Sequence, residues 1–304
     1  QLASNMDLEQ FRKHAHETVD FICDYYKNLE QYPVQSQVKP GEIANKLPQQ
    51  APEEGESFDT IMKDLKEIIM PGLTHWQHPQ FYAFFPANGS FPGIIGDMLS
   101  TGFGVQGMLW ITSPACTELE TVVLDWFAKA LNLPQKFHYR TGTGGGVIQG
   151  TASEAALVCL VAARHRTLKR ILSDPNNKLT EDEIKSKFTV YASDQTHSSI
   201  KKACMIAGIS LSHFKVISTQ ETNLAMTAQK FEEAIEQDKK NGLIPIFVCS
   251  TVGTTGTTAV DDLTGIGKIC QSEHIWMHVD AAYAGSACIC EEYRPLINGI
   301  ELAD

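Results

Sequence analysis

A single carboxylate follows an apolar run in the segment Ile275-Trp276-Met277-His278-Val279-Asp280-Ala281-Ala282-Tyr283-Ala284-Gly285. The run from 275 to 279 predicts a buried strand, which places Asp280 at the carboxyl edge of a sheet, where open α/β folds hold their ligands. The small residues after Asp280 leave room for a flat group beside the backbone. A carboxylate there can pair with a cationic ring nitrogen, as proteins do to keep pyridoxal phosphate protonated as an electron sink. A turn or cap residue is the alternative interpretation of Asp280.

A second segment, from Gly144 to Ser153, leads small and hydroxylated residues directly into a run of strong helix formers. The start of such a helix offers free backbone N–H groups, two hydroxyls and the positive end of the helix dipole to a phosphate. The segment is not a dinucleotide fingerprint, because Val147 stands where the third glycine should fall, and no Gly-Lys-Ser/Thr follows as in a P-loop. A plain helix cap by Thr151 or Ser153 is the alternative.

Polar residues also follow two other predicted strands. The run 188–192 continues into a loop that contains His197, which can stack on an aromatic cofactor and relay protons near neutral pH. A solvated loop histidine is the alternative. The run 247–252 is followed by glycines and threonines up to Thr258, which can hydrogen-bond a cofactor oxygen or a substrate carboxylate. Ordinary turn chemistry is the alternative there.

In this order and at these separations, the four segments resemble the group II pyridoxal-phosphate-dependent decarboxylases, and within them the aromatic L-amino-acid decarboxylase family. The resemblance covers essentially the whole chain. The matching strings are His75-Trp76-Gln77-His78-Pro79, Phe84-Phe85-Pro86, Ser113-Pro114-Ala115-Cys116-Thr117-Glu118-Leu119-Glu120, Gly144–Ser153, Ser193–Ser199 and His278–Gly285. Strings of this length exclude a chance match.

The resemblance implies roles for the matching residues and pyridoxal 5'-phosphate as the cofactor. His197 and Asp280 are the expected catalytic residues: Asp280 pairs with the ring nitrogen, and His197 stacks on the ring face opposite Ala282. The expected phosphate and oxygen contacts are Thr151, Ala152, Ser153 and Thr255. The expected substrate-binding residues are Trp76, Phe84, Phe85, Pro86, Ala87, Gln106 and Met108. From residue type alone, the aromatic members of this set would be assigned to the core.

Two of these residues bear on substrate choice. The segment Gly102–Trp110 matches the stretch that completes the neighbouring pocket across the family's dimer interface, and Gln106 and Met108 depart from its usual apolar and aromatic residues. An amide adds hydrogen-bonding capacity, which favours hydroxylated rings over phenylalanine. The alternative is that Gln106 faces solvent and Met108 only fills space.

The Schiff-base lysine of the family comes a few residues after the motif Gly299–Asp304, which ends this chain. We therefore expect the chain to be a piece of a longer enzyme whose small C-terminal domain is also outside it. A real truncation or a degenerate paralogue is the alternative. Lys201 and Lys202 are expected on a solvated helix face rather than on the cofactor.

The alternation of elements predicts an α/β fold of the type I pyridoxal-phosphate-dependent transferase class, with a mostly parallel sheet and helices on both faces. The expected strands are 188–192, 213–217, 244–249 and 275–279. The expected helices between and before them are 153–172, 198–207, 227–240 and 262–272, with a further helix after Ser113 that turns Leu119, Val123, Trp126, Phe127 and Leu131 inward.

The N-terminal part is expected to be helical. Apolar residues at helical spacing predict helices from Asp7 and from Phe58, joined by an extended connector over 31–55. Two such helices need another surface to pack on. We expect residues 1–84 to be a dimerisation segment, residues 85–304 to be an incomplete large cofactor-binding domain, and the enzyme to be a homodimer with shared active sites.

The sequence has 304 residues, of which 43% are hydrophobic and 20% charged, so the chain can bury a substantial core, as expected for a large part of an enzyme. The net charge of −11 argues against a nucleic-acid surface. Because the sequence has neither a bilayer-spanning apolar run nor a signal-peptide pattern at Gln1–Asn5, we expect a cytoplasmic protein with no membrane partner. The eight cysteines form no Cys-x-x-Cys pair, so we expect small buried hydrophobes and no metal site.

The predicted activity is decarboxylation of aromatic L-amino acids of the tyrosine, DOPA or tryptophan type to their amines and CO2. Three alternatives stay open. These are an aromatic aldehyde synthase, which couples decarboxylation to oxidative deamination, a histidine decarboxylase, and a catalytically dead homologue that acts as a binding partner. His197 favours plain decarboxylation over the aldehyde outcome.

Overall fold

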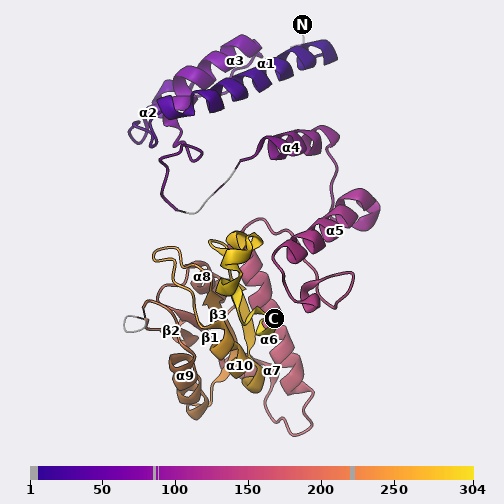
Figure 1. The fold of residues 1–304 in the computed structure, drawn as a ribbon, viewed down its shortest axis with the longest axis vertical. Helices are drawn as coiled ribbons and strands as arrows, with labels where there is room; N and C mark the ends of the chain where they lie inside the picture. The colour runs from indigo at the N-terminus through magenta and orange to yellow at the C-terminus, as the bar shows by residue number, and fades with distance from the viewer. Residues whose placement is uncertain (1–5, 85–86, 88, 220–222) are drawn as a thin grey trace. The chain divides into compact units, whose positions relative to one another are not determined.

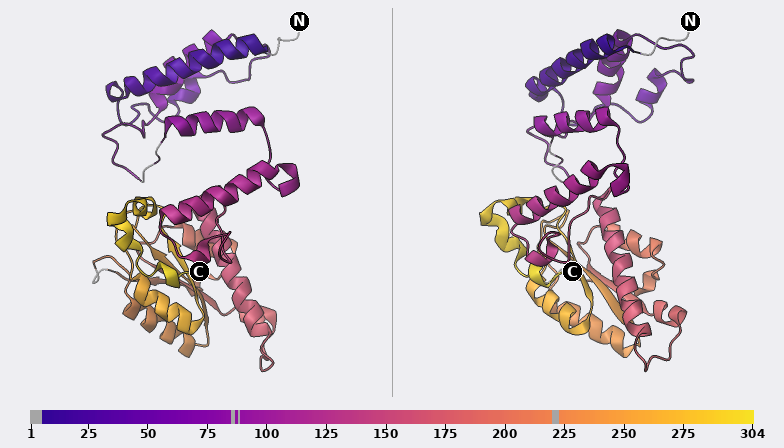
Figure 2. Two further views of the ribbon diagram at one scale, coloured as in Figure 1. Left: turned by 45° about the vertical axis from the view of Figure 1, so that its right-hand side comes forward. Right: turned by 90° about the vertical axis from the view of Figure 1, so that its right-hand side faces the viewer.

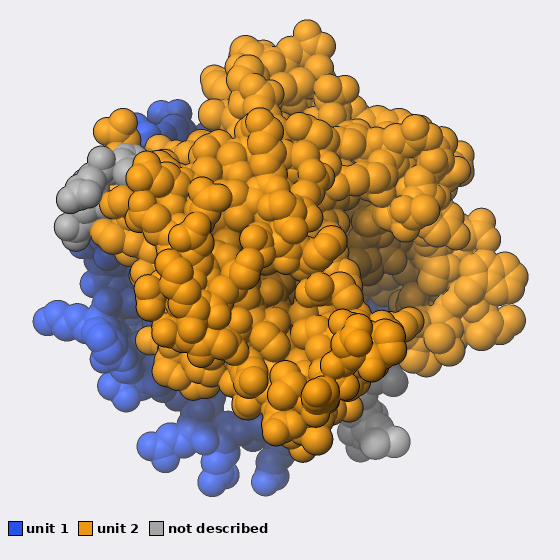
Figure 3. Space-filling view, turned by 90° about the horizontal axis from the view of Figure 1, so that it is seen from below, with its two compact units in different colours: residues 1–98 blue, residues 99–304 orange. Residues whose placement is uncertain are grey.

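The computed structural model describes residues 6–84, 87, 89–219 and 223–304. The chain divides into two compact units, residues 1–98 and 99–304, which Figure 3 colours separately. None of the helices in the described ranges combines the length and the apolar character that a membrane crossing requires.

The first unit is helical. α1 (Leu8–Lys27) begins at a capping box, in which the Asp7 side chain accepts the N–H of Gln10 and the Gln10 side chain accepts the N–H of Asp7. α3 (Phe58–Asp64) begins at the Ser57 cap and continues as a wider helical turn over Leu65–Ile69. The helices predicted from Asp7 and Phe58 are confirmed. The expected extended connector is wrong in one respect, because the short helix α2 (Glu42–Lys46) interrupts it.

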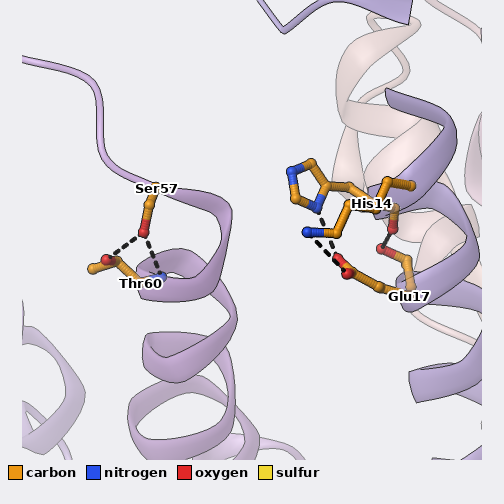
Figure 4. Close-up of polar contacts among 6 residues, drawn as sticks. His14, Glu17, Ser57 and Thr60 are labelled. Atoms are coloured by element: carbon orange, nitrogen blue, oxygen red, sulfur yellow. Dashed lines mark hydrogen bonds and ion pairs between the residues drawn. The ribbon is translucent and has the colours of Figure 1, made fainter. Parts of the chain in front are cut away.

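α1 and α3 meet through a ring stack, in which His14 and Phe58 lie 4.1 Å apart at 27°. Polar contacts flank this stack (Figure 4): the N–H of Thr60 bonds to the Ser57 hydroxyl, and His14 Nδ1 lies 2.8 Å from the Glu17 carboxylate. The hydrogen bond to His14 lowers the pKa of Glu17. Leu8, Phe11 and Val19 of α1 are exposed, whereas Phe21 and Ile22 further along the helix are half-buried.

The second unit contains a four-stranded parallel sheet in the order β2-β1-β3-β4. The strands are β1 (Phe188–Ser193), β2 (Phe214–Ile217), β3 (Ile244–Thr251) and β4 (Trp276–Asp280). They match the predicted strands to within a few residues. β1 and most of β3 are buried, which accounts for their nearly continuous apolar sequence.

Helices cover both faces of this sheet (Figure 2). α6 (Ala152–Leu172) and α8 (Ser199–Ile206) form one core, in which Leu160 packs with Cys249 of β3. α9 (Ala228–Lys240) and α10 (Leu263–Glu273) form the other, in which Phe231 packs with Val248. Successive residues of β3 thus point into opposite cores. The predicted helices and the layered α/β architecture are confirmed.

Three helices precede or interrupt this pattern: α4 (Phe91–Phe103), α5 (Pro114–Ala130) and α7 (Glu181–Lys185). α5 starts with Pro114 at its first position, as predicted. The predicted inward orientation of its apolar stripe is wrong for Leu119, Val123, Trp126 and Phe127, which are exposed. It is borne out only for Leu131, which is half-buried against the core. Helical spacing identifies an apolar face, but it does not say which surface covers that face.

The cysteines divide into two groups. Cys204, Cys249, Cys270 and Cys288 are buried, as predicted, and Cys159 is half-buried. The prediction is wrong for Cys23, Cys116 and Cys290, which are exposed. All eight are free thiols.

Candidate functional site at the carboxyl edge of the sheet

α6 runs antiparallel to the strands on which it packs. Arg166, in the last third of α6, stacks 4.6 Å from the ring of Trp276, the first residue of β4. The first turn of α6 therefore lies towards the other end of the sheet, where the parallel strands finish (Figure 1). This places the starts of the loops after β1, β3 and β4 and the start of α6 at one edge, the usual ligand-binding edge of an open α/β sheet.

Asp280 ends β4 and is half-buried. Its backbone carbonyl accepts the N–H of Val252 at 2.9 Å, and its Cα partner in the ladder is Thr251 of β3. Its carboxylate accepts the N–H of Ala282 at 3.1 Å. Strand pairing and the following turn thus both hold this carboxylate at the edge, while Ala282 itself is exposed there.

The loop after β3 lies directly on the turn after Asp280. Gly253 has a φ of +82°, and a Cβ at this position would lie 2.7 Å from the Ala284 Cβ, so only glycine fits. Thr254 is fully buried, and its hydroxyl accepts the N–H of Ala259 at 3.0 Å, which closes the loop. Thr255, the predicted cofactor contact, is exposed on the surface of this loop.

His197 lies in the loop between β1 and α8, with its side chain exposed. Its Nδ1 accepts the N–H of Ser199 at 3.2 Å. Because a backbone N–H can only donate, a neutral His197 ring carries its proton on Nε2. The same loop is attached to the end of β2 through Asp194, whose carboxylate accepts the N–H of Thr219 at 3.2 Å and also the Thr219 hydroxyl proton. Burial acts to raise the pKa of Asp194, but the hydrogen bonds that its carboxylate accepts, chiefly those from Thr219, together lower it.

The first turn of α6 is capped by Thr151, whose hydroxyl oxygen accepts the N–H of Glu154 at 3.1 Å. The Glu154 carboxylate in turn accepts the N–H of Gly150 at 3.0 Å. Of the two caps that the sequence suggested, the structure uses Thr151. Ala152 and Ser153 are exposed beside it, so the hydroxyls and main chain of this turn face outward at the sheet edge.

Asp261 is a buried part of this edge that sequence reasoning missed. It is 3% exposed, and its carboxylate accepts the N–H groups of Met226 at 2.7 Å and Thr251 at 2.8 Å. Burial raises its pKa to about 6, in spite of the two hydrogen bonds that lower it. The neighbouring Asp262 merely caps α10. Nothing in the sequence distinguishes these two adjacent carboxylates.

His278 and Cys249 lie opposite each other on β4 and β3, immediately inside the edge. Burial lowers the pKa of His278, and Asp280 opposes this effect. The ring of His278 lies 5.6 Å from that of Phe247 at 21°. Burial, together with the nearby carboxylates, raises the pKa of the Cys249 thiol well above its ordinary value. Both side chains therefore favour their neutral forms at neutral pH.

The predicted substrate-binding residues fall in both units. In the first unit, the rings of Trp76 and Phe84 are stacked 5.4 Å apart at 9°. Ala87 is exposed, and Phe85 and Pro86 lie outside the described residues. In the second unit, Gln106 and Met108 lie in the segment between α4 and α5, and both are exposed.

Comparison with known proteins decides the family. The sequence profile described as "Pyridoxal-dependent decarboxylase conserved domain" matches residues 40–304. The chain belongs to this family. The family and the fold class expected from the sequence are thereby confirmed, and a dependence on pyridoxal phosphate is the property that defines the family.

Individual pyridoxal-dependent decarboxylase relatives are similar over nearly the whole chain. A phenylacetaldehyde synthase of Arabidopsis thaliana is 52% identical, with 98% of this chain and 59% of the relative covered. Tyrosine decarboxylase 2 of Narcissus pseudonarcissus is also 52% identical, with coverage of 98% and 58%. The crystal structure of Catharanthus roseus tryptophan decarboxylase in complex with L-tryptophan has a TM-score of 0.92 at 46% identity, with coverage of 99% and 62%. The chain thus spans about three fifths of the length of these relatives.

Proposed function

We propose that the full-length protein decarboxylates aromatic L-amino acids of the tyrosine, DOPA or tryptophan type to amines and CO2, with pyridoxal 5'-phosphate as cofactor. One observation carries this proposal. Asp280, His197, Thr255 and the first turn of α6 come from four separate segments and meet at one edge of the sheet. The names of the relatives, which include tyrosine and tryptophan decarboxylases, support the substrate class.

The residues at this edge fit the cofactor. Asp280 is followed by Ala281 and Ala282, whose small side chains leave space beside the carboxylate for a flat ring, and the exposed Ala282 lies next to it. We assign Asp280 to the ring nitrogen, Ala282 to one ring face and His197 to the other. The phosphate contacts would be Thr151, Ala152 and Ser153, and Thr255 would bond a cofactor oxygen. The bound cofactor supplies an electron sink for cleavage of a bond at the substrate α-carbon.

The protein's own groups set the efficiency of that sink. An ionised Asp280 keeps a proton on the ring nitrogen, and each pKa unit of that stabilisation corresponds to about 1.4 kcal/mol. The N–H of Ala282 and the β3–β4 ladder restrict the motion of this carboxylate. His197, oriented by the N–H of Ser199, presents Nε2 as the nitrogen that can exchange a proton.

The substrate wall and the dimer belong to the same proposal. We assign the wall to Trp76, Phe84, Phe85, Pro86 and Ala87, with Gln106 and Met108 contributed across a homodimer interface. We also propose that residues 1–84 form a dimerisation segment and that residues 85–304 form the cofactor domain. Support for a covering partner comes from large exposed apolar side chains on α4, α5 and the segment between them, which include Ile95, Leu99, Phe103, Met108, Trp110 and Trp126. A cytoplasmic location is proposed from the free thiols.

An aromatic aldehyde synthase is the second candidate. The two relatives at 52% identity are a decarboxylase and an aldehyde synthase, so overall similarity does not separate the two outcomes. We favour the amine product because the stacking position is filled by a histidine, His197, oriented for proton exchange.

Product analysis of the full-length protein tests the proposal. Tyrosine, DOPA, tryptophan, phenylalanine and histidine are each supplied, and amine, CO2, aldehyde and ammonia are quantified. We expect amine and CO2 in equal amounts from an aromatic substrate, and a visible absorption band of the bound cofactor that borohydride removes. Aldehyde and ammonia as main products would establish the synthase, and a strong preference for histidine would contradict the aromatic assignment. A protein with neither band nor turnover would be a binding homologue.

A further inference from the structure

Two histidines of the first unit are buried on either side of an outward-facing tryptophan. His75 and His78 are only 3% and 6% exposed, whereas Trp76 is 39% exposed. Buried imidazoles need hydrogen-bond partners, because an unpaired buried polar group is costly. The partners of these two rings show what they hold in place.

His75 joins the tryptophan segment to α1. Its Nδ1 lies 2.8 Å from the hydroxyl of Tyr25 on α1, and its ring lies 4.9 Å from that of Tyr32. Its backbone N–H donates to the carbonyl of Val34 at 3.0 Å. Burial, with a smaller contribution from His78, lowers the pKa of His75, which favours the neutral ring at neutral pH.

His78 completes the attachment locally. Its backbone N–H donates to the His75 carbonyl at 2.9 Å, and its Nδ1 accepts the N–H of Gln80 at 3.0 Å. The segment 75–80 is thus a closed turn. The side chain of His75 bonds it to Tyr25 of α1, and the side chain of Gln77 bonds it to the backbone of Ala87 and Gly89. Of these contacts, the His75–Tyr25 hydrogen bond is the one that connects the turn to α1.

The turn carries a group of three stacked rings, Trp76, Phe81 and Phe84, which we call the aromatic triad. Trp76 lies 5.0 Å from Phe81 and 5.4 Å from Phe84, with interplanar angles of 28° and 9°. Phe84 has a φ of 61°, a left-handed conformation that is unfavourable for a residue with a Cβ. Such a conformation persists only where the surroundings hold it.

We propose that His75 is a positioning residue for the aromatic side of the substrate pocket: the hydrogen bond between its buried ring and the half-buried Tyr25 sets the place of the aromatic triad relative to α1. The inference rests on the proposed function, in which Trp76 and Phe84 belong to the pocket wall. A wall that is in place for only a fraction of the time weakens apparent substrate affinity by that fraction. His75 therefore acts on KM and on discrimination between rings, while the sheet-edge residues of the second unit act on cofactor chemistry.

The test compares Tyr25→Phe, His75→Phe and the double variant in the full-length protein. Each single change leaves the other member of the pair without its hydrogen-bond partner, and the double change removes both polar groups. We expect each single variant to raise KM for tyrosine and tryptophan by about 5- to 100-fold and to alter the ratio of the two kcat/KM values. Cofactor affinity, measured by fluorescence titration, should stay within about 2-fold of wild type in all three variants. In the double variant, the increase in log KM for the substrate should be at most about half of the increase in the single variants.

A matched control is available on the same helix. His14 is also hydrogen-bonded and stacked on an aromatic ring, but its contacts are to Glu17 and Phe58 rather than to the turn 75–80. His14→Phe should leave KM and ring discrimination unchanged. If the wild-type protein turns over no aromatic amino acid, the proposed function itself fails. If it is active, but the Tyr25 and His75 variants lose only thermal stability and keep wild-type KM and discrimination, His75 is structural and the inference is wrong.

Discussion

Replacement of Asp261 by asparagine is expected to change how stability depends on pH. In the folded protein, burial raises the pKa of Asp261 to about 6, against an ordinary value of 3.8. A raised carboxyl pKa means that the folded state binds the proton more tightly, so the free energy of unfolding falls as pH rises from about 4 to about 6. With these two pKa values, proton linkage predicts that the contribution of Asp261 to the free energy of unfolding decreases by about 2 kcal/mol between pH 4.5 and 7.5. The asparagine side chain of the variant does not titrate in this range and contributes no such decrease.

The assay is urea unfolding of wild type and Asp261→Asn at several pH values. Subtracting the two free energies of unfolding at each pH removes the contribution of all other titrating groups, which both proteins share. Asp261 accepts the buried N–H groups of Met226 and Thr251, and in the variant one of these two groups faces the amide N–H₂ and has no acceptor. This lost hydrogen bond lowers the free energy of unfolding of the variant by about 1–3 kcal/mol at all pH values. Wild type should therefore be the more stable protein, by a margin that shrinks by about 2 kcal/mol as pH rises to 7.5. Hydrogen exchange of the Met226 and Thr251 amides should follow the same trend. A margin that is constant or grows with pH would refute the reasoning.

Three further substitutions test the site itself. Asp280→Ala should lower kcat by at least about 100-fold at saturating cofactor, because the ring-nitrogen partner is lost while the first turn of α6 is untouched, and near wild-type turnover would exclude that role. His197→Asn should slow decarboxylation by about 100-fold and raise the share of aldehyde and ammonia; unchanged rate and products would leave the imidazole with a packing role only. Gln106→Leu should reduce the kcat/KM preference for tyrosine and DOPA over phenylalanine by about 5- to 100-fold, and an unaltered preference would mean that Gln106 does not contact the ring hydroxyl.

The sheet and its covering helices were predictable because local patterns encode them directly. Strands 188–192 and 275–279 are apolar runs of strand length, and each is followed at once by small or polar residues. A chain of alternating strands and helices has few ways to bury its apolar surface other than a parallel sheet with helices on both faces. The carboxyl edge then follows from strand direction alone, which is why Asp280 and His197 could be placed there from the sequence.

The sequence did not predict which surface packs against each apolar helix face. The stripe on α5 has the spacing of a core helix, yet Trp126 and Phe127 are exposed. A periodic pattern records that a face is apolar, and the cover can come from the same chain or from a partner. The same limit applies to Cys23, which has the sequence surroundings of a buried residue and lies on the surface of α1.

The sequence by itself determined the family, the order of the strands along the chain and the residues that reach the carboxyl edge of the sheet, because these depend on motifs, periodicity and strand direction. Only the tertiary structure decided which polar side chains are buried and desolvated. Asp261 and Asp262 are neighbours of identical chemistry, but one is buried on the N–H groups of Met226 and Thr251 while the other caps α10. His75 is likewise set apart by Tyr25, a partner 50 residues away. Desolvation and long-range hydrogen bonding depend on neighbours in space, so local sequence patterns did not reveal them.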